Sequence, residues 1–183
     1  MPASAWYAGY VETVVDKGLF SGKGEGTFGP EDSMTYAEFL VVLSQFSGER
    51  IPGAAGAWYQ GYVNWAENAG LIPAGMGSFN PDAPITRQDM AALFGNFLES
   101  YGGAVEPVNE GSASFADAAS IAGYAAGGVQ TCSELGLMSG NADGTFAPLN
   151  TPTRAEEAGT TTQLARRMVK TMPPRAPIRS PAP

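Results

Sequence analysis

Two kinds of segment each occur three times along the chain, and in most of them apolar residues recur at helical spacing. In the first kind, an aromatic residue at position 6 is followed by apolar residues at positions 10, 11, 14 and 15, the stripe of an amphipathic helix. A glycine twelve residues after the aromatic suits a left-handed C-cap, and the leucine after it can fold back onto the helix. The opening aromatics and closing pairs are Trp6 with Gly18-Leu19, Trp58 with Gly70-Leu71, and Tyr124 with Gly136-Leu137.

The second kind of segment opens at a threonine that an acidic residue follows three positions later, namely Thr35, Thr86 and Thr153. This is the pattern of a capping box, in which the hydroxyl accepts from the amide three residues on and the acid reaches back. Losing such a cap costs about 1 kcal/mol, so we expect helices to begin here. The residue after the threonine, an arginine in two copies, is not explained by capping.

Core-spaced residues follow the threonine in the first two copies but not in the third. The positions are occupied by Phe39, Val42, Leu43 and Phe46 in the first copy and by Met90, Leu93, Phe94 and Phe97 in the second. In the third copy they hold Glu157, Thr160, Thr161 and Leu164. The third helix is therefore expected either to pack loosely or to shift its register before Leu164.

A loop ending in Gly-x-Phe-x-Pro joins the two segments of each copy. The distance from its phenylalanine to the threonine is 7 residues in every copy, and from opening aromatic to threonine it is 29, 28 and 29 residues. Such constancy identifies a three-fold repeat, so function is to be sought at the level of the repeat. The loops are Gly26–Pro30, Gly77–Pro81 and Gly144–Pro148.

This repeat resembles the S-layer homology module over about residues 2–172, most closely in the third copy, which has Phe115-Ala116-Asp117 and a full Thr-Arg-Ala-Glu box. The resemblance implies an all-α domain of three tandem helix-loop-helix modules with pseudo-three-fold packing. We expect modules over residues 1–48, 49–100 and 115–172, a linker over 101–114 and a disordered tail over 173–183, where five prolines lie among eleven residues.

The resemblance also implies a function, which is to dock surface proteins onto the secondary cell wall polysaccharide of bacterial peptidoglycan, often through a pyruvylated amino sugar. Its ligand contacts come from an aspartate before the first helix, the aromatic, the loop glycine and the box arginine. Such an arginine offers a planar fork to a carboxylate, backed by free helix amides, and an indole offers a flat face to a sugar. The matching residues here are Arg154, Arg87, Asp117, Trp6, Trp58, Tyr124, Gly26, Gly77 and Gly144.

Several family positions differ in this chain. Tyr36 replaces the box arginine of the first copy, and the aspartate is missing from the first two copies, so one groove is expected to be intact, or two if the aspartate is dispensable. Plain core packing of Trp6 and Trp58 is the alternative to a binding role. On this view Arg154→Ala abolishes glycan binding and changes the melting temperature by no more than about a degree or two, as for a surface residue.

Composition limits the chemistry further. The absence of histidine excludes Ser-His-Asp and Cys-His catalysis and most zinc sites, and Cys132, the only cysteine, aligns with core positions as a small filler. The turn Asn141–Gly144 hints at a calcium loop, but Pro152 stands where an EF-hand needs glutamate. The carboxylates form no convincing glycosidase pair. We therefore expect no catalytic residues, no metal and no cofactor.

Charge and hydropathy bear on partners and location. The net charge is −8, and residues 1–165 carry 5 basic and 18 acidic groups, which repels nucleic acid and anionic membranes. No stretch is long and apolar enough for a membrane span, and no signal peptide is recognisable. The chain starts too close to Trp6 for the expected Phe-x-Asp element, so we expect an N-terminally truncated piece of a protein located at the cell surface.

The sequence leaves three candidate functions. The first is a non-catalytic anchor that binds wall polysaccharide in an inter-module groove. The second is a degenerate repeat that has lost glycan binding and makes structural contacts with a surface-layer or cargo protein. An enzyme ranks third, because the chain lacks histidine and a convincing carboxylate pair.

Overall fold

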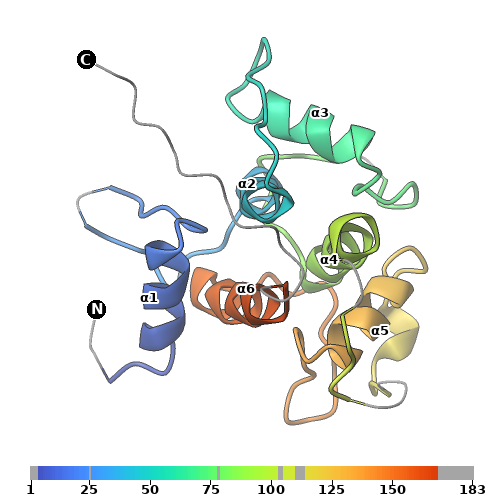
Figure 1. The fold of residues 1–183 in the computed structure, drawn as a ribbon. Helices are drawn as coiled ribbons and strands as arrows, with labels where there is room; N and C mark the ends of the chain where they lie inside the picture. Colours follow the sequence, from blue (N-terminus) through green and yellow to red (C-terminus); the bar gives the residue numbers. More distant parts are fainter. Residues whose placement is uncertain (1–3, 25, 78, 103–104, 110–113, 169–183) are drawn as a thin grey trace.

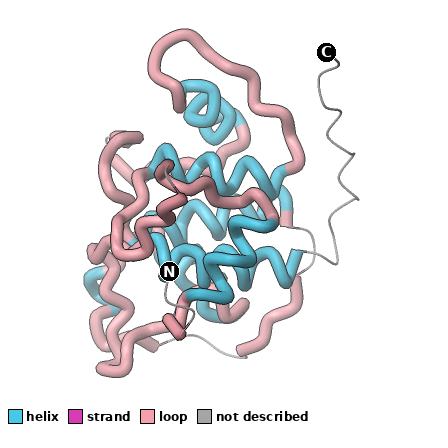
Figure 2. The backbone as a smooth tube through the Cα atoms, turned by 90° about the vertical axis from the view of Figure 1, so that its left-hand side faces the viewer, coloured by secondary structure: helices cyan, strands magenta, loops and turns pink. Residues whose placement is uncertain are grey.

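A computed structural model describes the chain except residues 1–3, 25, 78, 103–104, 110–113 and 169–183. The described part is helical, without strands, which confirms the all-α prediction (Figure 1, Figure 2). The predicted tail over 173–183 and part of the linker over 101–114 lie outside the described residues. The helices are α1 (Ala8–Asp16) and α2 (Tyr36–Ser47) in copy 1, α3 (Gln60–Asn68) and α4 (Arg87–Tyr101) in copy 2, and α5 (Ala126–Glu134) and α6 (Arg154–Met168) in copy 3, with a 3-10 turn at Ala118–Ser120.

The second helices of the copies, α2, α4 and α6, lie at the centre, and the first helices surround them (Figure 1). Each outer helix packs on the central helix of the preceding copy: α3 on α2, α5 on α4, and α1 on α6. Because the last of these contacts joins copy 3 back to copy 1, the three copies form a closed ring. Within the described residues, no helix has the length and apolar character needed to cross a membrane.

The predicted helix ends are confirmed. Gly18, Gly70 and Gly136 all have left-handed backbones, with φ of 65°, 68° and 62°. The amide of the following leucine donates to the carbonyl five residues earlier, at 2.8 Å in each copy, and the leucine side chain is buried. This arrangement satisfies carbonyls at the helix end and places the apolar contact of a Schellman motif.

The central helices begin against the loop of the next copy. The amides of Arg154 and Ala155, the first two residues of α6, donate to Asp32 O at 2.7 Å and Pro30 O at 3.0 Å in the loop of copy 1. The first two amides of α2 and α4 bond in the same way to the loops of copies 2 and 3. The expectation that these amides are free for a ligand is therefore wrong, because neighbouring carbonyls take them.

The helix α6 keeps the register of α2 and α4. Glu157 and Thr161 are fully buried at the positions that Phe39 and Phe94 help to fill in the other copies, where the two rings meet edge to face at 4.9 Å. The register shift considered from the sequence does not occur. No described residue forms a hydrogen bond with the Glu157 carboxylate or the Thr161 hydroxyl, so these two polar groups of α6 are buried without a hydrogen-bond partner.

The helices α4 and α5 cross at small residues, which brings their backbones into contact. A Cβ added to Gly128 would lie 2.3 Å from Ala91 O and 2.7 Å from the Cα of Ala92, whereas one added to Gly127 would meet nothing within 4 Å. At the matching helix positions the other copies carry Tyr10 and Tyr62.

This crossing gives a first prediction with a neighbouring control. Gly128→Ala is expected to lower the free energy of unfolding by about 2 kcal/mol, since an overpacked core must shift backbone. Gly127→Ala is expected to raise it by about 0.5–1 kcal/mol, through helix propensity alone. Urea denaturation of both variants checks the pair, and equal effects would contradict the close crossing.

Candidate functional site

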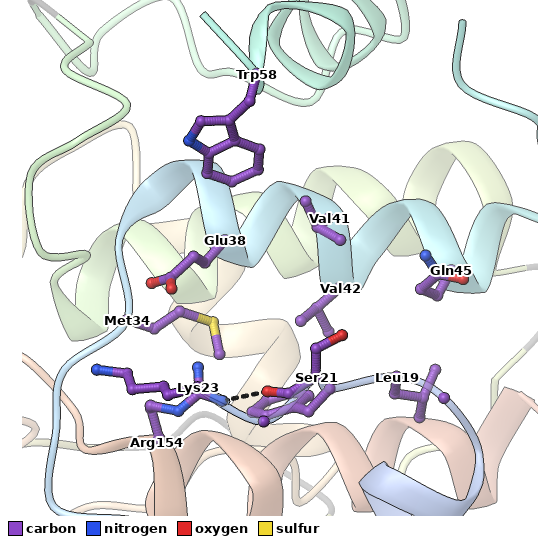
Figure 3. A pocket seen from close by; sticks show the side chains of 13 residues that line it. Leu19, Ser21, Lys23, Met34, Glu38, Val41, Val42, Gln45, Trp58 and Arg154 are labelled. Carbon is purple, nitrogen blue, oxygen red and sulfur yellow. Dashed lines mark hydrogen bonds between the residues drawn. The ribbon is translucent and has the colours of Figure 1, made fainter. Parts of the chain in front are cut away.

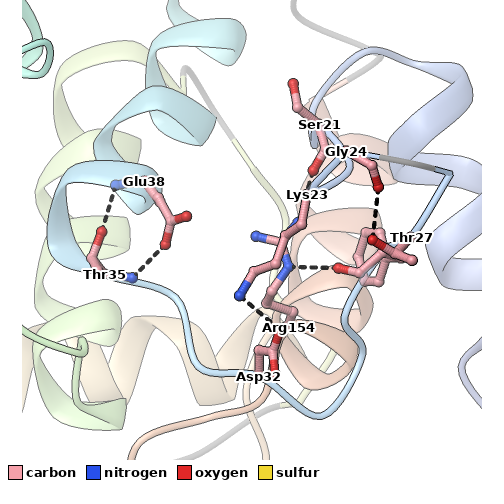
Figure 4. Close-up of polar contacts among 9 residues, drawn as sticks. Ser21, Lys23, Gly24, Thr27, Asp32, Thr35, Glu38 and Arg154 are labelled. Carbon is pink, nitrogen blue, oxygen red and sulfur yellow. Dashed lines mark hydrogen bonds and ion pairs between the residues drawn. The ribbon is translucent and has the colours of Figure 1, made fainter.

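Arg154 crosses from copy 3 into the loop of copy 1. Its Nε donates to Phe28 O at 3.0 Å and its Nη2 to Ser21 O at 2.8 Å, while its guanidinium lies 4.8 Å from the centre of the Phe28 ring (Figure 4). Only 4% of the residue is exposed. The arginine left unexplained by capping thus has a structural role, which is to hold the neighbouring copy's loop against the start of α6.

Arg87 makes the same contacts one copy earlier. It donates from Nε to Phe146 O and from Nη2 to Ser139 O, both at 2.8 Å, and lies 4.7 Å from the Phe146 ring centre. Burial lowers its pKa, against the opposing influence of Glu156 and then Asp117, but the guanidinium remains the charged form. Arg87 therefore lies close enough to Asp117 for the two charges to interact.

At the remaining junction between copies, Tyr36 of copy 1 stands in place of the arginine, and tyrosines make the polar contacts. The hydroxyls of Tyr36 and Tyr124 donate to the two oxygens of the buried Asp89 carboxylate, the second at 2.6 Å. Burial, with this bond to Asp89, raises the pKa of Tyr124 to about 12, so it stays protonated at neutral pH. The ring of Tyr36 also meets Phe79 edge to face. The residues that replace the arginine and the tryptophan, Tyr36 and Tyr124, thus both donate to Asp89, which lies between them.

A cavity of about 300 Å³ lies at the junction that Arg154 closes (Figure 3). We call it the Trp58 cavity. One wall is the segment Gly18–Lys23 of copy 1, a second is the face of α2 with Glu38, Val41, Val42 and Gln45, and the floor includes Met34 and Arg154. Trp58 of copy 2 stands over its mouth (Figure 3). Three copies therefore contribute to one cavity.

Trp6 and Trp58, the tryptophans that open copies 1 and 2, are not core residues. Trp6 is 65% exposed and Trp58 is 63% exposed, and each ring meets the following tyrosine edge to face at 5.4 Å. Core packing, the alternative considered from the sequence, is therefore excluded. The tyrosine contact fixes each ring while leaving an apolar face open, which suits stacking on a sugar.

Asp117 and the loop glycines have evident structural roles. The Asp117 carboxylate accepts from the amides of Phe146 at 2.7 Å and Ala147 at 2.8 Å, and the first of these bonds holds its pKa below the ordinary value. The bonds hold Ala147 at φ 55°, an unusual backbone for alanine. The predicted glycines have φ of 72–81° and exposed positions, and none lines the Trp58 cavity; they are Gly26, Gly77 and Gly144.

The structure therefore sorts the nine predicted residues among different places. It brings Trp58 and Arg154 together in the Trp58 cavity and Asp117 near Arg87, and it places Tyr124 in the closed junction. Sequence reasoning missed Lys23, the cavity's other cation, because the repeat positions matching it hold Gly75 and Asn141.

The electrostatics of the Trp58 cavity are unusual for so acidic a chain. Among the described residues, no carboxylate lies within 4 Å of the Arg154 guanidinium, and Lys23 forms the one ion pair, with Asp32 at 2.7 Å (Figure 4). The nearby Glu38 carboxylate is engaged at the Thr35 amide, which it accepts at 2.8 Å. The two cations, Lys23 and Arg154, thus lie near two carboxylates, Asp32 and Glu38, each of which already has a partner.

Comparison with protein families agrees with this arrangement. The model of the S-layer homology domain matches residues 1–40, 51–91 and 114–157, one match in each copy. The chain belongs to the S-layer homology domain family. The three matched copies of the S-layer homology domain correspond to the three helix pairs of the closed ring.

Relatives of two kinds share this S-layer homology region. The chain is 28% identical over 161 residues to an amylopullulanase of Thermoanaerobacterium thermosulfurigenes, covering 84% of the chain and 9% of the relative. It is 29% identical over 162 residues to an endoglucanase of Bacillus sp. (strain KSM-635), covering 85% and 17%, and 27% identical over 166 residues to the S-layer protein sap of Bacillus anthracis, covering 86% and 20%.

The chain thus spans a fifth or less of the length of these relatives. A domain shared by S-layer proteins and by enzymes with different names is a non-catalytic unit, and its distribution indicates anchoring to the cell wall at the cell surface.

Proposed function

We propose that this S-layer homology region is a non-catalytic anchor that binds secondary cell wall polysaccharide, and that a pyruvylated amino sugar of the polymer occupies the Trp58 cavity. The protein to which the region belongs would thereby be held at the surface of a bacterial wall. The observation that carries the proposal is the combination, at one cavity, of an exposed indole and a buried arginine without an ion-pair partner among the described residues.

The chemistry of each wall suits such a sugar. The exposed face of Trp58 can stack on the apolar face of a pyranose ring. Apolar side chains of Leu19, Val41 and Val42 can receive the methyl group of an acetamido or pyruvyl substituent. The positive potential of Arg154 favours a carboxylate, and the low dielectric around a buried guanidinium strengthens that attraction.

The net charge favours a sugar that carries a single carboxylate over an extended polyanion as the ligand. A chain of net charge −8 repels a polyanion at long range, so binding must rest on short-range contacts within the cavity. A single carboxylate in a cavity with two cations satisfies that condition, whereas extended phosphate recognition along the surface does not.

The test is a pull-down of the purified chain with bacterial wall sacculi, before and after acid extraction removes the secondary polymer. Binding that is lost on extraction supports the anchor. Trp58→Ala is expected to weaken binding to the unextracted sacculi about ten-fold, in the range of a lost stacking contact. Trp6→Ala removes an equally exposed indole that does not line the Trp58 cavity. It therefore reports how much of the binding to sacculi depends on a site other than that cavity.

Two outcomes would contradict the proposal. If neither preparation binds the chain, the region is not a wall anchor, and the search turns to protein contacts in a surface layer or with a cargo protein. If binding is unchanged in Trp58→Ala, the polymer is held elsewhere on the chain.

A further inference from the structure

Lys23 occupies a position in the Trp58 cavity that the repeat pattern does not explain. It lines the cavity together with Arg154, and its ammonium bonds to Asp32 Oδ2 at 2.7 Å (Figure 3, Figure 4). The side chain of Lys23 is 43% exposed and that of Asp32 is 50% exposed, so the pair is open to solvent. An ammonium has three donors, and this bond uses one of them.

The backbone holds Lys23 in place independently of that ion pair. The Lys23 amide donates to Thr27 O at 2.9 Å, and the Thr27 amide donates back to Gly24 O at 2.9 Å, which closes a tight turn. The same loop is held by Arg154, through Ser21 O and Phe28 O. Lys23 is thus presented to the cavity by a loop whose geometry does not depend on its charge.

Arg154 alone is poorly placed to bind a carboxylate in the bidentate manner. Two of its donors, on Nε and Nη2, are already used by carbonyl oxygens, and only 4% of the residue is exposed. It therefore supplies mainly positive potential, while a solvent-accessible ammonium can make the direct charge-assisted bond. Lys23 is the accessible cation of the cavity.

We infer that Lys23 is the residue that selects an acidic sugar in the Trp58 cavity, with Asp32 as the carboxylate that pairs with it in the unliganded state. This inference rests on the proposed function and adds a residue of copy 1 that the other two copies lack. Because Asp32 bonds to the Lys23 ammonium in the unliganded state, it competes with the ligand's carboxylate for Lys23 and so weakens binding.

The experiment measures calorimetric binding of a pyruvylated N-acetylhexosamine methyl glycoside and of its unpyruvylated parent. Lys23→Met keeps the apolar stem and removes the charge; it is expected to weaken the pyruvylated sugar about ten-fold, as for the loss of a charge-assisted bond, and to leave the parent within about two-fold. Lys17→Met removes an equal charge from an exposed position outside the cavity and is expected to change neither affinity.

Asp32→Asn separates a binding role from a structural one. It is expected to raise affinity for the pyruvylated sugar about three-fold in the otherwise unchanged chain, and to have no such effect when Lys23→Met is also present. A purely structural role of the ion pair would instead weaken both sugars in both variants. Melting curves confirm that each variant is folded.

The outcomes distinguish this inference from the proposed function. If the unsubstituted chain binds neither sacculi nor the pyruvylated sugar, the proposed function fails and the inference fails with it. If the chain binds the pyruvylated sugar and Lys23→Met binds it equally well, the inference alone is overturned. Selective loss of the pyruvylated sugar in Lys23→Met supports both.

Discussion

Replacing Arg154 by alanine is expected to lower the free energy of unfolding by about 3–4 kcal/mol, and the melting temperature by about 10 °C for a chain of this size. The substitution removes two charge-assisted bonds to the carbonyls of Phe28 and Ser21 and takes a guanidinium away from the faces of two aromatic rings. The loop of copy 1 then keeps only the backbone bonds from the amides of residues 154 and 155 to Asp32 O and Pro30 O.

Arg87→Ala is the matched control for this prediction. Arg87 makes the same pair of carbonyl bonds, but one of them is exposed to solvent, so the freed carbonyl can be hydrated. Its loss is expected to lower stability by about 1–2 kcal/mol. Thermal and urea denaturation of both variants provide the comparison. A melting temperature for Arg154→Ala within two degrees of the parent would contradict the structural role of Arg154 in holding the loop of copy 1.

This expectation replaces the one drawn from the sequence, in which Arg154→Ala left stability almost unchanged. The consequence for function is practical, because loss of glycan binding in that variant would not separate a lost contact from a displaced loop. Trp58 and Lys23, both exposed, are better positions for testing the cavity.

Features set by nearby residues could be predicted from the sequence. The left-handed glycines after α1, α3 and α5 and the threonine caps follow from contacts within about five residues, and both occur in the structure. Even so, Asp89 does not complete its predicted reciprocal box: its carboxylate is used by two tyrosines from other copies. No local pattern indicates that pairing.

The composition of the candidate site could not be predicted, because the Trp58 cavity is assembled from residues of three copies. The sequence suggested that copy 3, with the full Thr-Arg-Ala-Glu box and Asp117, carries the most complete site. In the structure the Arg154 side chain of copy 3 bonds to the loop of copy 1, whereas Asp117 of copy 3 lies near Arg87 of copy 2. The spacing of residues within a repeat does not say which neighbour each one contacts.

Replacing Glu157 by methionine, the residue at the matching position of α4, is expected to raise the free energy of unfolding by about 2–3 kcal/mol at pH 8. Glu157 is fully buried, and no described residue bonds to its carboxylate. Burial raises its pKa well above the ordinary value, outweighing the opposing influence of Arg154. Desolvation therefore dominates, and an apolar side chain of similar length removes the penalty.

The gain from Glu157→Met depends on pH, and the direction follows from the raised pKa. At a pH below the ordinary glutamate value the carboxyl is neutral in both folded and unfolded chains, so its charge imposes no penalty. As pH rises from there through the raised folded pKa, the unfolded chain loses its proton first and native stability falls. Urea denaturation of parent and variant between pH 4.5 and 8.5 should show a difference that grows with pH.

The control is Glu12→Gln, which removes the same charge from an exposed position on α1 and reports the benefit of lowering net charge alone. Asp32, Asp117 and Asp143, whose pKa values are lowered, lose their stabilising effect as pH falls, but they do so in parent and variant alike and cancel in the difference. A pH-independent gain would mean that packing, not the buried charge, limits α6. A loss of stability in Glu157→Met at pH 8 would show that Glu157 is needed as the counter-charge of Arg154, which would make the two residues a single electrostatic unit at the centre of the ring.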